Sequence, residues 1–142
     1  MYRHILIPTD GSELAEHGLA HGLALAKSVG AKVSVIFVIE PFPEMTGRFL
    51  ETLARYVELR KEQATSVLDR AANAAREAGV SCETIQVENA QPHQAIIAAA
   101  EDKGCNLIVM SWHGRSGLST LLIGSVTNKV LTYAKTPVLV CR

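Results

Sequence analysis

Five short strand-like runs, separated by helical patterns, constrain the fold of this chain more than any other feature. Four of them, residues 2–8, 32–39, 106–110 and 136–141, are rich in apolar residues, as expected of strands, and the remaining one, 81–87, alternates in polarity, as expected of a less buried edge strand. The stretches between them show helical periodicity. Because parallel strands need such crossover connections, the sequence predicts an α/β fold with a single doubly wound, five-stranded parallel sheet covered on both faces.

Two of the helices have boundaries that the sequence leaves open. A long helix is predicted over residues 48–78, which exceeds an ordinary globular helix, so we expect either a bend near Glu62 or an irregular first turn after Pro43. The last helix is predicted to begin near Thr120 or near Gly124.

Composition predicts one domain in the cytoplasm, with no nucleic-acid or membrane partner. A chain of 142 residues can bury one core but not two. Its 14 Lys and Arg balance 14 Asp and Glu, so it lacks the basic field that attracts nucleic acid or an anionic membrane. No apolar run is long enough for a signal peptide or a membrane span. Cys82, Cys105 and Cys141 form no C-x-x-C pair and are interpreted as small apolar residues in a reducing compartment.

The segment from Leu107 to Ser125 has the order of elements that suits a bound phosphate. It begins as a buried strand, continues as a loop that contains glycine, and ends with Gly124 and Ser125 at the start of a helix. Glycine lets the backbone approach an anion closely, and a helix start offers unpaired N–H groups with the positive end of the dipole behind them. The residues alone therefore predict an anion site.

The spacing Ser111-x-x-Gly114, nine residues, Gly124-Ser125 resembles the nucleotide motif G-x2-G-x9-G-[ST] of ATP-binding universal stress proteins. Residues 5–12 and 136–141 also resemble that family's first and last strands. The resemblance implies a Rossmann-like, adenine nucleotide alpha hydrolase-like fold with strand order 3-2-1-4-5. It also implies ATP with Mg²⁺ in the crevice between the loops after strands 1 and 4, and a homodimer formed through the C-terminal strand.

The resemblance and the residues together give a set of candidate ligand contacts. The resemblance assigns Pro8, Thr9 and Asp10 to nucleotide contact, gives Val38 a backbone contact with adenine, and faces Met110, Ser111 and Gly114 toward the crevice. The helix start predicts phosphate contacts from its first backbone N–H groups. These contacts would come from Gly124, Ser125, Val126 and Thr127.

Four residues of the motif loop carry separate expectations. Ser111 departs from the family's glycine; if that position needs a positive φ, serine costs about 1 kcal/mol, although its hydroxyl can still bond the ligand. His113 would contact phosphate or cap the loop. Arg115 would screen phosphate charge or serve as an exposed loop arginine, and the exposed role is favoured. Trp112, the only tryptophan, is expected to report bound ATP by its fluorescence.

The leading hypothesis is a regulatory ATP-binding module. The sequence has no Walker lysine, no Ser-His-Asp set and no paired carboxylates near the motif, so at most slow ATP hydrolysis is expected. His17 and His21 lie four residues apart, but the pattern is not H-E-x-x-H and no third ligand stands at the spacing of a known metal motif. They are interpreted as surface residues rather than metal ligands. The alternatives are a dimeric interaction protein of the same family that has lost nucleotide affinity, and a small enzyme of the wider hydrolase-like group.

Overall fold

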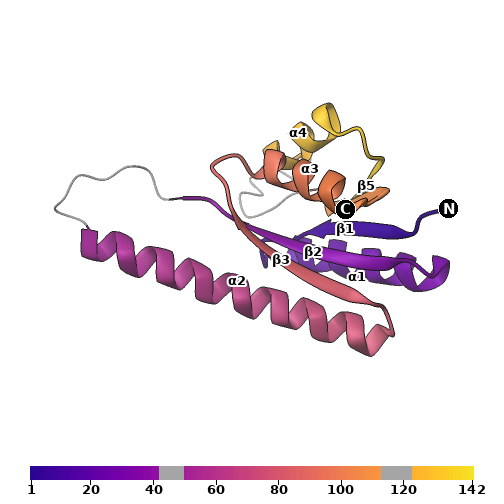
Figure 1. Ribbon diagram of the computed structural model, residues 1–142, viewed down its shortest axis with the longest axis horizontal. Coiled ribbons are helices and arrows are strands. Elements are labelled where there is room, and N and C mark those ends of the chain that lie inside the picture. The colour runs from indigo at the N-terminus through magenta and orange to yellow at the C-terminus, as the bar shows by residue number, and fades with distance from the viewer. Residues whose placement is uncertain (42–49, 113–122) are drawn as a thin grey trace.

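The computed structural model describes residues 1–41, 50–112 and 123–142, which form a parallel sheet with helices on both faces (Figure 1). In chain order the elements are β1 (His4–Pro8), α1 (Glu13–Val29), β2 (Lys32–Ile39), α2 (Leu50–Ala78), β3 (Cys82–Glu88), α3 (Pro92–Lys103), β4 (Leu107–Ser111), α4 (Ser125–Tyr133) and β5 (Val138–Cys141). The strands are ordered β3-β2-β1-β4-β5 and all pair in parallel. The predicted doubly wound, Rossmann-like fold and its strand order are confirmed.

Alternate residues of the strands face two separate cores. Ile5, Ile7 and Phe37 pack with α1 and α2 on one face of the sheet. Leu6 and Ile36 pack with α3 and α4 on the other. Figure 1 shows these two helical layers above and below the strands. Because β1 sits at the centre of the sheet, its Ile5, Leu6 and Ile7 are fully buried, which explains the uninterrupted apolar run in the sequence.

One predicted boundary was wrong, and a tertiary contact explains why. The fourth strand was predicted to end at residue 110, but β4 continues to Ser111 because that residue pairs with Cys141 of β5. The bend predicted near Glu62 is absent from the described α2, which is a single helix from Leu50 to Ala78. From Ala64 onward its buried residues pack against the sheet. The alternative, an irregular turn after Pro43, lies outside the described residues.

Two glycines let α1 lie unusually close to the sheet. A Cβ added at Gly22 would lie 2.5 Å from Ile7 Cδ1, and one added at Gly18 would lie 3.2 Å from the backbone nitrogen of Ser111. Gly18 and Gly22 are four residues apart and so share one face of the helix. The absence of side chains at these positions therefore sets the distance between α1 and strands β1 and β4.

The three thiols are unpaired, as the spacing predicted. Cys105 and Cys141 are buried and Cys82 is half-buried, and none forms a disulfide. Burial raises the pKa of Cys105 to about 11, so this thiol stays protonated and behaves as a small apolar group. Among the described helices, none combines the length and apolar character needed to cross a membrane.

Candidate functional site

A cavity of about 220 Å³ opens at the carboxyl ends of β1, β2 and β4. This is the edge at which an open α/β sheet binds ligands, next to the point where the winding reverses between β1 and β4. Ten residues that the sequence singled out line it: Pro8, Thr9, Asp10, Val38, Met110, Ser111, Gly124, Ser125, Val126 and Thr127. The fold thus brings together two segments that lie a hundred residues apart. His113, Gly114 and Arg115 fall outside the described residues.

The loop after β1 is held in shape by its own side chains. Thr9 is buried, its backbone N–H donates to Ile36 O at 2.9 Å, and its hydroxyl accepts from Gly11 N at 3.2 Å. One carboxylate oxygen of Asp10 accepts from Ser12 N at 2.9 Å. Asp10 is therefore both the turn aspartate that the Asp-Gly pair suggested and a wall of the cavity.

The start of α4 forms the opposite wall of the cavity. Gly124 is its N-cap, and within the described chain no side chain caps this helix. The backbone N–H groups of the first turn have no intrahelical acceptor, and the positive end of the helix dipole lies behind them. Thr127 anchors the turn, since its buried hydroxyl donates to Ser111 O at 3.0 Å. Gly124 N in turn donates to Trp112 O at 2.9 Å. The helix start is thus fixed against the end of β4.

Ser111 does not carry the backbone cost that the sequence suggested. It is the buried last residue of β4, and no described residue other than glycine has a positive φ. Its Cβ lies 3.5 Å from where a Cβ on Gly18 would stand, so its side chain begins on the α1 side of the sheet. The predicted cost of about 1 kcal/mol was conditional on a positive φ or a close phosphate approach, and the first condition is not met because the β4–β5 ladder keeps this position extended.

Apolar side chains line the part of the cavity nearest β2 and α3. Ile36 and Val38 come from β2, Pro92 and Ile96 from α3, and Met110 from β4. Ile36, Ile96 and Met110 are buried, and Val38 is half-buried. A cavity with an apolar end and a few convergent polar groups suits a small molecule that has a flat apolar part and a charged part.

Two charged residues of the cavity were missed by the sequence reasoning. Glu40 follows β2, and Arg60 comes from α2. The Arg60 guanidinium carbon lies 5.6 Å from the centre of the Phe37 ring, and its Nη1 donates to Gln63 Oε1 at 2.6 Å. One signal could have found Arg60: it lies four residues before the buried Ala64, which puts a charge in the apolar stripe of the helix.

Trp112 lies beside the cavity rather than in it. Its indole ring packs under the Arg142 guanidinium, whose carbon is 4.8 Å from the ring centre, and Trp112 is not a lining residue. Its backbone N–H donates to Cys141 O at 2.6 Å. A ligand at the start of α4 would therefore change the fluorescence of Trp112 indirectly, through the hydrogen bond between Gly124 N and Trp112 O. The predicted response stays a prediction.

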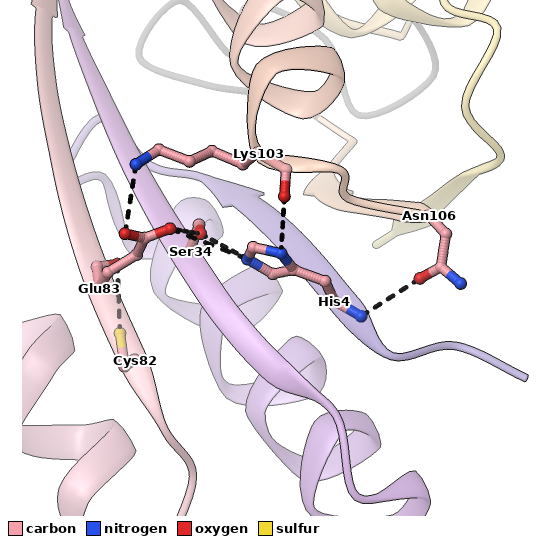
Figure 2. Close-up of polar contacts among 6 residues, drawn as sticks. All are labelled: His4, Ser34, Cys82, Glu83, Lys103 and Asn106. Carbon is pink, nitrogen blue, oxygen red and sulfur yellow. Dashed lines mark hydrogen bonds and ion pairs between the residues drawn. The ribbon is translucent and has the colours of Figure 1, made fainter.

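A second polar cluster occupies the opposite end of the sheet (Figure 2). His4 Nε2 lies 2.7 Å from Ser34 Oγ, and its Nδ1 lies 3.1 Å from Lys103 O. The Ser34 hydroxyl donates to Glu83 Oε1 at 2.7 Å, and Lys103 Nζ donates to Glu83 Oε2 at 3.3 Å. Burial, and then the Lys32 ammonium, lower the pKa of His4.

This serine, histidine and glutamate set does not form a hydrolytic site. Ser34 is 0% exposed, so no substrate can reach its hydroxyl. The hydrogen bond from Ser34 is the largest cause that lowers the pKa of Glu83, which keeps this carboxyl ionised. The cluster instead fastens β1, β2, β3 and the end of α3 to one another. The cavity at the carboxyl edge is the better candidate site.

The whole chain, residues 1–142, matches the model of the Universal stress protein family. Universal stress protein MJ0531 of Methanocaldococcus jannaschii is 34% identical over 142 residues, which covers 100% of this chain and 83% of the relative. The solved structure of hypothetical protein MJ0577 has a TM-score of 0.78 at 32% identity and covers 99% of this chain and 95% of its own. A universal stress protein solved in complex with cAMP has a TM-score of 0.73 at 24% identity, covering 99% of this chain and 97% of its own.

Proposed function

The chain belongs to the universal stress protein family, and from this premise we propose that it binds an adenine nucleotide, ATP with Mg²⁺, in the cavity at the carboxyl edge of its sheet. The observation that carries the proposal is the convergence of the Asp10 loop, the start of α4 and an apolar wall on one cavity. A structural relative in complex with cAMP supports an adenine nucleotide as the ligand class.

Each part of the cavity has chemistry that suits one part of the nucleotide. The N–H groups at the start of α4 would bind phosphate oxygens, and the hydroxyl of Ser125 would add a further donor. The carboxylate of Asp10 would hold a ribose hydroxyl or a water bound to Mg²⁺. Asp10 and Glu40 are hard oxygen donors, which fits a Mg²⁺ ion held mainly by phosphates and water. The apolar wall would enclose the base.

We infer that the protein is a cytoplasmic regulatory module rather than an efficient ATPase. Among the described residues that line the cavity, Asp10 and Glu40 are the carboxylates, and one oxygen of Asp10 already accepts a backbone N–H. Efficient hydrolysis needs a general base that positions water, and the lining offers no histidine for that role among the described residues. Three unpaired thiols fit a reducing compartment.

Replacing Asp10 by asparagine tests the proposal without disturbing the loop. The amide oxygen of asparagine can still accept the Ser12 N–H, so the thermal midpoint of unfolding should stay close to wild type. Loss of the carboxylate charge should weaken MgATP binding about tenfold, the usual effect of losing a hydrogen bond to a charged group. Isothermal titration calorimetry measures the dissociation constant, and differential scanning fluorimetry measures the midpoint.

Glu13→Gln provides the matched control, because Glu13 is an exposed carboxylate in the first turn of α1 that does not line the cavity. It should bind MgATP as wild type does. If wild type itself gives neither binding heat nor a thermal shift at millimolar MgATP, the nucleotide proposal is wrong. The chain would then be the interaction protein without nucleotide affinity.

We propose that two copies pair through β5. This strand is an edge of the sheet, so one row of its backbone groups is available to a second strand, and Leu139 is 36% exposed on it. Leu139→Lys should shift the protein from dimer to monomer, which sedimentation velocity at micromolar concentration resolves. A wild-type monomer under these conditions, or a variant that remains dimeric, would contradict the pairing.

A further inference from the structure

We propose that Arg60 recognises the base of the bound nucleotide, by donating a hydrogen bond to an acceptor nitrogen of the purine ring. The inference rests on the proposed function and goes further by naming the group that reads the base. It assigns a ligand contact to α2, a helix that neither nucleotide motif in the sequence includes.

The position of Arg60 puts it at the base end of the cavity. Its guanidinium lies over Phe37 of β2, whereas α4 follows β4. Strands β2 and β4 are separated by β1, so about 10 Å lie between them at the usual strand spacing. A nucleotide whose phosphates meet the start of α4 would extend across β1 toward β2. Its base would therefore lie between the apolar wall and Arg60.

The hydrogen-bonding state of Arg60 leaves a donor for a ligand. Its Nε is buried and has no hydrogen-bond partner in the part of the chain that the structure describes. Nη1 is occupied by Gln63 Oε1. Of the ion pairs between described residues, none includes Arg60. Because Nε is buried, a ligand acceptor reaches it only after the guanidinium turns toward the cavity that Arg60 lines. An acceptor there would remove the cost of a buried N–H group without a partner.

The chemistry of the cavity favours a base over a phosphate as the partner of Arg60. Val38, Pro92 and Ile96 can enclose a flat ring but cannot hydrogen-bond it through their side chains. A guanidinium can lie against an aromatic ring and donate from its edge, and here its carbon lies 5.6 Å from the centre of the Phe37 ring. The purine ring offers nitrogen acceptors at N1, N3 and N7. Because adenosine has the same ring without phosphates, the contact should contribute equally to adenosine and ATP.

Calorimetric titration of Arg60→Met with MgATP and with adenosine tests the inference. Methionine keeps an apolar stem over Phe37 and removes every donor, so both ligands should bind roughly 10- to 100-fold more weakly, the range for a hydrogen bond from a charged group. Arg70→Met is the matched control, because Arg70 is exposed on the same helix and does not line the cavity. The control should bind both ligands within about twofold of wild type.

Three ring analogues identify the atom that Arg60 contacts. Among 1-deaza-, 3-deaza- and 7-deazaadenosine, one should bind wild type more weakly than adenosine does, by the same factor as the Arg60→Met change. That analogue and adenosine should bind the Arg60→Met variant equally, because the contact is already lost. Should Arg60→Met fail to fold, Arg60→Lys serves in its place, since lysine keeps the cation but lacks the Nε donor.

Several results would overturn the inference. A loss of affinity for MgATP with unchanged adenosine affinity would put the guanidinium on the phosphates. Unchanged affinity for both ligands, or equal affinity of wild type for all three analogues and adenosine, would leave Arg60 as a packing residue over Phe37. If wild type binds neither MgATP nor adenosine, both the proposed function and this inference are wrong. The titration of wild type detects that case before any variant is measured.

Discussion

Replacing Gly124 by valine should weaken MgATP binding by at least about 100-fold, because several charge-assisted hydrogen bonds to phosphate are lost together. Gly124 caps α4 at φ −61° and ψ 151°, a conformation that any residue adopts without strain. The valine side chain would instead fill the cavity where the phosphates meet the first N–H groups of the helix. The loss should therefore appear mainly in affinity, with a modest loss of stability because valine is a poorer N-cap residue than glycine.

Calorimetry with MgATP and thermal unfolding of the same preparations check this expectation. Gly124→Ala, with a single methyl group, should give an intermediate loss of affinity. Ser111→Gly restores the full glycine motif and should bind MgATP as tightly as wild type or more tightly. Because Ser111 has no backbone strain, the change relieves none, and any gain would come from closer approach of the phosphate. Wild-type affinity in the valine variant would mean that no phosphate lies at the start of α4.

The second large effect is on stability: Gly22→Val should lower the free energy of unfolding by about 3 kcal/mol, the upper range for overpacking a core. A Cβ at this position would lie 2.5 Å from Ile7 Cδ1 and 3.5 Å from Val109 Cγ1. Ile7 and Val109 are both fully buried, so neither can move aside without disturbing the sheet. In an exposed helix, by contrast, the same change would be slightly favourable, because glycine has a lower helix propensity than valine.

Urea denaturation followed by circular dichroism measures this change. Ala20→Val on the exposed face of the same helix is the control, and propensity alone should make it cost about 0.5 kcal/mol. If Gly22→Val is as stable as wild type, α1 can move away from the sheet, and the close packing set by Gly18 and Gly22 is not a constraint on the fold.

The sequence predicted most of the fold because its information is local and periodic. Four of the five strands are apolar runs and β3 alternates in polarity, and both patterns are visible in the sequence alone. Strand order depends on which strands pair, and it came from the family resemblance. The end of β4 was predicted one residue early because Ser111 is extended by its pairing with Cys141, a partner thirty residues away in the chain.

The residues of the candidate site also fall into two groups: those that a local motif predicts and those that depend on tertiary packing. Asp10 and Gly124 could be predicted because each belongs to a short motif that directly follows a strand or opens a helix. For Arg60 the sequence offers only a charge in the apolar stripe of a helix, and its place in the cavity depends on how that long helix packs over Phe37. The packing role of Gly22 could not be predicted either, because it depends on the contact with Ile7, which the sequence does not reveal.

The hydrogen bond from Gly124 N to Trp112 O has a consequence for the entropy of ligand binding. Together with the bond from Thr127 to Ser111, it holds the end of β4 and the start of α4 at a fixed separation. Bringing together the ends of a segment such as 113–123 costs on the order of 2 kcal/mol of conformational entropy. The protein's own hydrogen bonds already hold these two ends together, so a nucleotide that contacts the start of α4 does not have to bring them together.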